Sequence, residues 1–351
     1  MTTPESTAGK AEAPSADVGT PFGLFDGFEA YRTPTEQDHR DLLTTGLVVP
    51  DTNVLLNLYR YNDRTRHDLL DVLRGLGKTL WVPRQVVVEF WRNREAVLAD
   101  PRESAKTTED LEQRREGALR VLRGWAGRVD LPHERCAELI DGLSRAFGTV
   151  IAAVGELDDA EAAAFVGNTS VDWVLSALEE ILRGRVGAPL GEDEQAEALA
   201  EARRRGQARI PPGYMDAAKD PEAAAGDYLI WVQTLREARR RRVDVLLVTG
   251  DLKEDWWRRE GGEPRGPRYE LAEEMAAVAG VGLFMLRPDD LLRRARSILR
   301  VAVREESVEN VERVGRSLAE AADEDRYPGA DVPAPPLPLT GGLDDQADLV
   351  D

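Results

Sequence analysis

Short apolar runs alternate with amphipathic stretches along much of the chain. Runs as long as a buried strand occupy residues 46–50, 80–83, 243–248 and 281–286. Stretches with apolar residues at helical spacing lie between and after them, chiefly from Thr52 to Leu73 and over residues 85–98, 227–241 and 271–279. Strands that alternate with helices predict an α/β fold with a mainly parallel central sheet. Such sheets bind ligands at the carboxyl ends of their strands.

The regions outside this alternating pattern differ from it in composition. Residues 100–206 are rich in Ala, Leu, Glu and Arg and lack a strand pattern, so they predict a helical insertion of several segments. We expect the main domain to span residues 23–290 and further helices to occupy 291–322. Residues 1–22 and 323–351 are polar, with a Pro-rich, acidic C-terminal end, and predict disordered tails.

Composition narrows the class of protein. The 351 residues, 42% of them hydrophobic, suffice for one large domain with an insertion. A single cysteine, Cys136, excludes an intrachain disulfide and favours a cytoplasmic protein. The N-terminal residues lack the apolar core of a signal peptide, and the apolar runs are too short to span a membrane. The few His and Cys residues are widely spaced, which argues against a structural zinc site.

The net charge of −19 at first argues against nucleic acid as a partner. Part of the negative charge lies in the C-terminal tail, and an acidic catalytic cluster would account for another part. Bound divalent cations would neutralise such a cluster. The charge therefore argues against a large, tight nucleic-acid footprint, but it does not exclude a nucleic-acid substrate.

Two aspartates follow predicted strands directly. Asp51 follows the run at 46–50, and Asp251 follows Thr249 and Gly250 at the end of the run at 243–248. Asp51 alone could equally be the N-cap of the next helix. Two carboxylates at the same sheet edge are harder to explain as independent caps, because like charges about 4 Å apart repel by roughly 4 kcal/mol at an effective dielectric of 20. A divalent cation between them would turn this repulsion into attraction.

Two further acids occupy positions that suit the same cluster. Glu89 lies among apolar residues of the helix predicted from residue 85, and these neighbours argue against an ordinary position on the exposed face of that helix. Asp227 follows Gly226 at the start of another predicted helix. Asp227 could cap that helix, ligate a metal, or do both.

Four short motifs around these acids resemble the ordered acidic motifs of PIN-domain nucleases. They are Asp51-Thr52-Asn53, Glu89-Phe90-Trp91, Gly226-Asp227 and Thr249-Gly250-Asp251. The resemblance is clearest over residues 47–95 and 210–274, and it is closest to a bacterial PIN-like subgroup with a long helical insertion.

The resemblance implies a PIN-like three-layer fold and an endoribonuclease that hydrolyses phosphodiester bonds with Mg²⁺ or Mn²⁺. Asp51, Glu89, Asp227 and Asp251 would hold the metal and form the catalytic cluster. Oxygen ligands of this kind suit both ions. The resemblance favours RNA over DNA as the partner, and a role in a toxin–antitoxin pair or in defence is consistent with it.

Other residues could support the chemistry. Asn53 and Thr249 could orient a water or a carboxylate, and Arg92, Arg94 and Lys253 could bind phosphate. Asp255 and Asp220 could lie near the cluster, as could Asp216. An ordinary salt bridge or helix cap explains each of these residues equally well. For Trp256 and Trp257 we expect packing rather than stacking on bases, and the arginines that follow them, Arg258, Arg259, Arg265 and Arg268, are candidates for contact with a nucleic-acid backbone.

Two other functions remain as alternatives. A phosphatase of the haloacid dehalogenase type would use Asp51 as nucleophile, but it needs an acid two residues later, where this chain has Asn53. A PIN-like module could also bind RNA or protein without cutting, because fold alone does not determine function. The helical insertion could then serve a protein partner or a homo-oligomer.

Overall fold

Three parallel strands form the centre of the protein: β1 (Leu47–Pro50), β2 (Val245–Val248) and β5 (Leu283–Leu286). In the computed structural model, which describes residues 23–25, 31–98, 102–166, 168–216 and 221–326, β2 lies between β1 and β5. The register aligns Pro50 with Val248 and Val248 with Leu286. All three strands therefore end at the same edge of the sheet.

Alternate strand residues face two separate hydrophobic cores, as the pleat of a strand requires. Val48 and Leu246 lie in one core, whereas Val49 and Leu247 lie in the other. The first core is covered by α1 (Glu36–Thr45), α2 (Thr52–Leu56), α3 (Asp63–Leu76), α4 (Arg84–Leu98), α7 (Trp173–Leu182), α12 (Pro288–Ile298) and α13 (Glu305–Arg326). The second is covered by α8 (Glu192–Ala208), α10 (Gly226–Arg241) and α11 (Tyr269–Ala279). The expected α/β fold, with helices on both faces of a parallel sheet, is confirmed.

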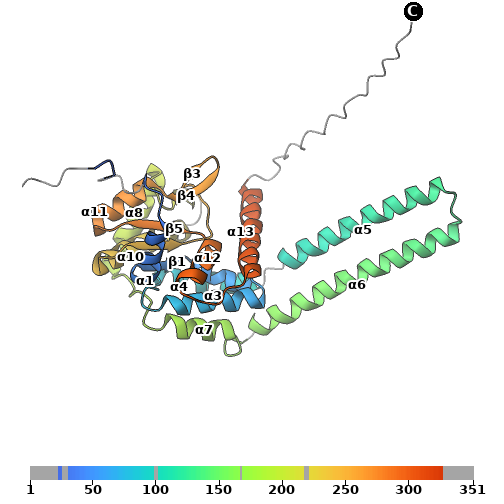
Figure 1. The fold of residues 1–351 in the computed structure, drawn as a ribbon, viewed down its shortest axis with the longest axis horizontal. Helices are drawn as coiled ribbons and strands as arrows, with labels where there is room; N and C mark the ends of the chain where they lie inside the picture. Colours follow the sequence, from blue (N-terminus) through green and yellow to red (C-terminus); the bar gives the residue numbers. More distant parts are fainter. Residues whose placement is uncertain (1–22, 26–30, 99–101, 167, 217–220, 327–351) are drawn as a thin grey trace, which may run out of the picture.

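The helical insertion divides into two parts. Its first two helices, α5 (Arg102–Arg128) and α6 (His133–Val166), pair with each other and project from the sheet and its helices as an arm (Figure 1). Its last two, α7 and α8, instead pack into the two cores of the body, the part of the protein outside the arm. The expectation of a helical insertion is confirmed, but only α5 and α6 stand apart from the body.

A buried ion pair closes the base of the arm. Arg94 lies on α4 just before the arm, and Asp172 caps α7 just after it. The two side chains form an ion pair at 2.5 Å and are 3% and 0% exposed. The hydroxyl of Tyr59 donates to Asp172 at 2.8 Å and accepts from Arg94 at 3.1 Å. This clasp ties together the two segments from which the arm leaves the body.

The structure departs from the sequence prediction in two strand regions. Residues 80–83 do not form the expected strand. Leu80 and Val82 form only isolated bridges, to Val48 and Val186 respectively. An antiparallel hairpin, β3 (Trp257–Glu260) and β4 (Glu263–Pro267), was not predicted. Most of its residues are at least partly exposed, so it lacks an alternating apolar pattern.

The ends of the chain also refine the expected boundaries. Helix α13 continues through Arg326, past the expected start of the C-terminal tail at residue 323. The expected N-terminal tail, residues 1–22, and residues 327–351 of the expected C-terminal tail lie outside the described residues. The remaining short helices are η2 (Asn57–Tyr59), η3 (Tyr214–Asp216) and α9 (Pro221–Ala224). None of the described helices is long and apolar enough to cross a membrane.

Candidate functional site

The carboxyl ends of β1 and β2 are joined by a polar network. Asp51 follows β1, and its carboxylate accepts hydrogen bonds from the Thr249 hydroxyl at 2.7 Å and from the amide of Asn53. The Thr249 hydroxyl in turn accepts from the backbone N–H of Asp251 at 3.0 Å. The Asn53 carbonyl oxygen accepts from the N–H of Gly250 at 2.8 Å. Asp51 and Asp251 therefore share one sheet edge, as the sequence predicts, and Asn53 and Thr249 orient them.

Asp51 is also a helix cap, so the capping interpretation of it from the sequence is confirmed. Its Oδ1 accepts from the N–H of Thr52 at 2.7 Å at the start of α2. Burial raises the pKa of Asp51 to about 6, against the opposing hydrogen bond from Thr249. The neighbouring charges of Glu89 and Asp251 contribute to this raised pKa. Asp51 thus lies close enough to Glu89 and Asp251 for their charges to affect its pKa.

Glu89 reaches this edge from α4. Its carboxylate accepts from the Thr52 hydroxyl at 2.8 Å and from the Gln85 amide at 3.0 Å. A Cβ atom added to Gly226 would lie 2.3 Å from Oε1 of Glu89. The start of α10 therefore lies against the carboxylate of Glu89, and a side chain at residue 226 would push that carboxylate aside.

Asp227 does not cap its helix. The N-cap position of α10 is Ala225, and Oδ2 of Asp227 is buried without a hydrogen-bond partner among the described residues. Burial raises the pKa of Asp227 well above its usual value. The charge of Lys253 opposes this shift, whereas the charges of Asp251 and Asp216 add to it. The capping interpretation of Asp227 is therefore wrong, and a buried carboxylate oxygen lies free of hydrogen bonds beside a charged cluster.

Lys253 provides positive charge among these carboxylates. Its ammonium lies 2.8 Å from Oδ2 of Asp251, 2.9 Å from Oδ2 of Asp216 and 3.8 Å from Oδ2 of Asp227. Burial alone would lower the pKa of Lys253, but the charges of the three acids raise it above its usual value. Lys253 is therefore held as a cation by acids from three separate segments of the chain.

Asp255 positions one of the segments that form this cluster. It is fully buried, and its Oδ2 accepts from the N–H groups of Gly213 and Met215 at 2.9 and 3.1 Å. These bonds fix the turn that carries Asp216 toward Lys253. Burial raises the pKa of Asp255, and the bond from Met215 opposes that shift. Asp255 therefore lies near the cluster, as the sequence suggested, and its bonds position the Asp216 turn.

The two tryptophans after this motif are packing residues, as expected. Trp256 and Trp257 are both buried, and Trp256 meets Trp231 edge to face. The indole N–H of Trp257 donates to the backbone carbonyl of Asp251 at 2.7 Å. The pair therefore anchors the segment that carries Asp251 and Lys253.

The residues expected to bind phosphate have different environments. Arg94 cannot do so, because it is buried in the ion pair with Asp172 at the base of the arm. Arg92 is 43% exposed and lies 3.6 Å from Glu222, so its guanidinium remains accessible. Lys253 is occupied by carboxylates. Asp220, an expected neighbour of the site, lies outside the described residues.

Sequence reasoning missed two supporting residues. Thr52 and Gln85 hold Glu89, and each lies beside a residue already selected, one next to Asp51 and one a helical turn before Glu89. Spacing along α4 could have identified Gln85. Arg259, a candidate from the sequence, lies on the unpredicted hairpin, and its guanidinium donates to the carbonyl of Leu252 at 2.5 Å.

The donor set suits a hard divalent cation, although the side chains do not converge on one point. Among the described residues, no group of three or more His, Cys, Asp or Glu side chains is arranged to hold a metal ion. The edge nevertheless gathers Asp51, Glu89, Asp227 and Asp251, with oxygen atoms as their only donors, which Mg²⁺ and Mn²⁺ prefer. Oδ2 of Asp227 accepts no hydrogen bond among the described residues and has the Lys253 ammonium 3.8 Å away, so a cation or a proton suits it. The residues fit such an ion once side chains turn toward it.

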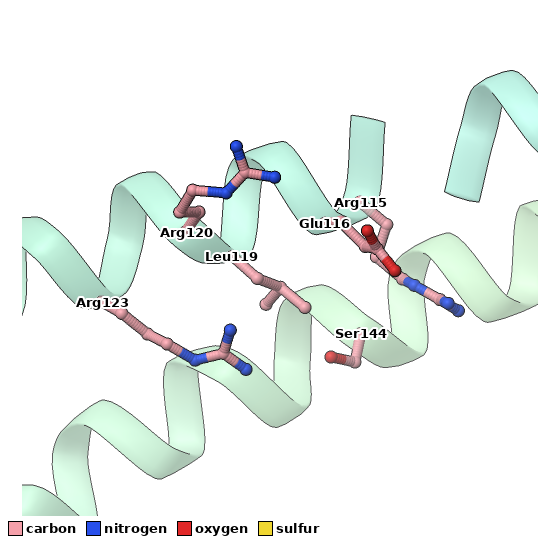
Figure 2. A pocket seen from close by; sticks show the side chains of 6 residues that line it. All are labelled: Arg115, Glu116, Leu119, Arg120, Arg123 and Ser144. Carbon is pink, nitrogen blue, oxygen red and sulfur yellow. The ribbon is translucent and has the colours of Figure 1, made fainter. Parts of the chain in front are cut away.

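A second polar surface lies on the arm. Arg115, Arg120 and Arg123 of α5 line a cavity of about 480 Å³ together with Glu116, Leu119 and, from α6, Ser144 (Figure 2). Arg120 and Arg123 are exposed, and Leu119 is buried between the helices. This basic groove, the surface formed by the three arginines, contrasts with the acidic sheet edge.

Comparison with known proteins assigns residues 47–271 to a family described as PIN-like domain. The match covers nearly two thirds of the chain and contains every acid gathered at the sheet edge. Neither the curated proteins nor the solved structures yielded a match.

Proposed function

The chain belongs to the PIN-like domain family, and from that premise we propose that it is a metal-dependent endoribonuclease. The observation that carries the proposal is the gathering of Asp51, Glu89, Asp227 and Asp251 around the carboxyl ends of parallel strands. Among the described ion pairs, Lys253 contacts two of these four carboxylates, Asp227 and Asp251, so the cluster keeps excess negative charge. That charge requires a cation, and a phosphodiester substrate requires one too.

The chain's own residues would hold the ion and fix its ligands. Asp51 and Asp251 would be the principal ligands, with Glu89 and Asp227 completing the acidic cluster. When bound, Mg²⁺ or Mn²⁺ supplies the Lewis acidity that activates water and stabilises the leaving oxygen. Thr249 and Asn53 hold the carboxylate of Asp51 in place, and Thr52 and Gln85 do the same for Glu89. Oriented ligands of this kind reduce the reorganisation that the reaction needs.

Arginines outside the cluster would bind the nucleic-acid backbone. Arg259 and Arg92 lie near the site and keep partly or fully exposed side chains. The basic groove of the arm offers three further guanidinium groups. A guanidinium binds phosphate through paired N–H donors, which suits a substrate that the acidic body would otherwise repel. We therefore propose RNA as the substrate, with the arm as an auxiliary contact.

A phosphatase of the haloacid dehalogenase type suits the geometry less well. That mechanism needs an acid at position 53 to protonate the leaving group. Asn53 fills that position, and its amide is engaged by Asp51, Thr249 and Gly250. The network makes Asn53 an orienting residue and leaves no proton donor there.

The proposal is tested by incubating labelled single-stranded RNA and DNA with the protein in Mn²⁺, in Mg²⁺ and in EDTA. We expect internal cuts in RNA with either metal and none in EDTA. An Asp51→Asn/Asp251→Asn variant should cut neither polymer. Cutting that persists in EDTA would contradict the proposal. Metal binding without any cutting of RNA or DNA would instead favour a non-catalytic RNA- or protein-binding module.

A further inference from the structure

Lys253 links three carboxylates that the chain brings from three places. Asp216 lies in η3, Asp227 in the first turn of α10, and Asp251 three residues after the end of β2. The ammonium lies within 3.8 Å of an oxygen from each, and its side chain is 19% exposed. A cation at the centre of three carboxylates occupies a position in which a metal ion could otherwise bind.

The acidic edge therefore has two unequal halves. In one half, Asp216, Asp227 and Asp251 share Lys253. In the other, Asp51 and Glu89 are held by neutral donors, namely the side chains of Thr249, Asn53, Thr52 and Gln85. In the part of the chain that the structure describes, neither Asp51 nor Glu89 forms an ion pair with a lysine or arginine. The half without a lysine is the one that still lacks a positive charge.

On the basis of the proposed nuclease function, we propose that Lys253 takes the place of a second divalent cation, so that the protein binds one metal ion, on the Asp51–Glu89 half. Two-metal nucleases hold their ions about 3.5–4 Å apart with shared carboxylates. Asp251 is the carboxylate between the two halves, since it contacts Lys253 and raises the pKa of Asp51. An ammonium is a compact point charge with three donors, which suits it to replace an ion among three carboxylates.

The geometry also gives Lys253 a positioning role. Asp216 lies in a short turn whose backbone N–H groups donate hydrogen bonds to Asp255. Lys253 connects this turn to the end of β2 through its ion pair with Asp216. Without the ammonium, the three carboxylates would repel one another across this gap. Removing the lysine should therefore open the second half to a metal ion and make the protein more dependent on that ion for stability.

Calorimetric titration of the full-length protein with Mn²⁺ tests the proposal, with thermal unfolding in EDTA and in Mn²⁺ as a second measurement. The variants are Lys253→Met, Lys253→Arg, which keeps the charge, and Lys78→Met as a matched control at an exposed lysine. Asp51→Asn in each background identifies the ions that belong to the edge, because ions bound elsewhere persist in it.

We expect the wild type, Lys253→Arg and Lys78→Met each to bind one Mn²⁺ at the edge. Adding Asp51→Asn to any of the three should abolish that binding. The Lys253→Met variant should bind a second ion and should show a larger stabilisation by Mn²⁺ than the wild type. Two ions in the wild type would overturn the proposal for Lys253 and leave the nuclease proposal standing, even if Lys253→Met failed to fold. An unchanged count and affinity in folded Lys253→Met would also overturn it. No specific ion in the wild type would overturn the nuclease proposal, and with it this inference.

Discussion

The acidic edge of the sheet and the arm are built on opposite principles. The edge lies where two buried cores meet the strand ends, and its side chains are held by hydrogen bonds from neighbouring elements. On the described side chains of the arm, only Leu119 and Ala126 are buried, whereas Val121, Trp125 and Val150 are among its exposed apolar residues. The edge concentrates negative charge and the arm carries a basic groove.

This contrast separates two tasks that a nuclease must perform. Chemistry requires carboxylates held in fixed positions, which only a packed scaffold supplies. Backbone binding requires accessible cations and tolerates a looser support. On the proposed function, the body would supply the reaction and the arm would supply affinity, so substitutions in the two regions should change different kinetic constants.

The largest expected effect is on the edge. Asp51→Asn or Asp251→Asn should reduce RNA cleavage by at least about 10³-fold, because an ion that stabilises the transition state by several kcal/mol loses a principal ligand. Initial rates in Mn²⁺ measure the loss, and circular dichroism checks that the fold is kept. Asp71→Asn, at an exposed pair with Arg74 on α3, is the matched control. Full activity in both site variants would remove the edge from the mechanism.

The second effect tests the junction between the two regions. Arg94→Met should lower the free energy of unfolding by about 3–5 kcal/mol, because it leaves Asp172 buried without its partner. Urea unfolding measures this change. Arg92→Met, at an exposed position on the same helix, should change stability by less than about 0.5 kcal/mol. Equal stabilities for the two variants would show that the clasp does not hold the base of the arm.

The third effect is a pH dependence of the free energy of unfolding, which we expect for a substitution at the edge and not for one in the arm. The pKa of Asp51 is raised from 3.8 to about 6 in the folded protein, so its protonated form contributes stability below pH 4 that is lost as the pH rises through 6. In EDTA, the stability of Asp51→Asn relative to wild type should therefore improve by up to about 3 kcal/mol between pH 4 and pH 7.5.

Urea unfolding at both pH values measures this difference. A stability difference between Asp51→Asn and wild type that stays constant with pH would show that burial does not perturb Asp51. A substitution in the arm, such as Arg135→Glu, should show no such dependence, because Arg135 is exposed and paired only with Glu138 among the described ion pairs.

The smallest effect is on the arm. Arg120→Glu/Arg123→Glu should raise KM for RNA about tenfold and leave kcat unchanged, because reversing two exposed charges weakens binding of the backbone equally in the ground and transition states. Steady-state kinetics at low salt measures both constants. Arg135→Glu, elsewhere on the arm, should change neither. A fall in kcat with unchanged KM would mean that the groove acts on the chemical step instead of on affinity.

The sequence predicts the strand-end part of the edge well, because Asp51 and Asp251 follow apolar strands. The apolar runs before Asp51 and Asp251 mark where parallel strands end, and the register places both ends at one level. Asn53 and Thr249 were selected for the same reason, and the structure joins them to Asp51. Local pattern suffices here because the strand direction alone determines which residues meet.

Residues whose partners are distant in sequence were not predictable in this way. Arg94 follows Glu89 by five positions, which turns its side chain about 140° around the helix and away from Glu89. Its partner, Asp172, lies on the far side of the arm in sequence. Lys253 meets Asp216 only because Asp255 fixes an irregular turn, and no periodic pattern marks such a turn. The hairpin was missed because its residues are largely exposed.

The most direct test of the metal at the acidic edge is a crystal of the protein soaked in Mn²⁺ and measured for anomalous scattering. We predict an anomalous peak between Asp51 and Asp251, at a coordination distance of about 2.0–2.3 Å from a carboxylate oxygen of each. Crystals of Asp51→Asn should lack the peak. Mn²⁺ found only away from the strand ends, or no bound Mn²⁺ at all, would contradict the account.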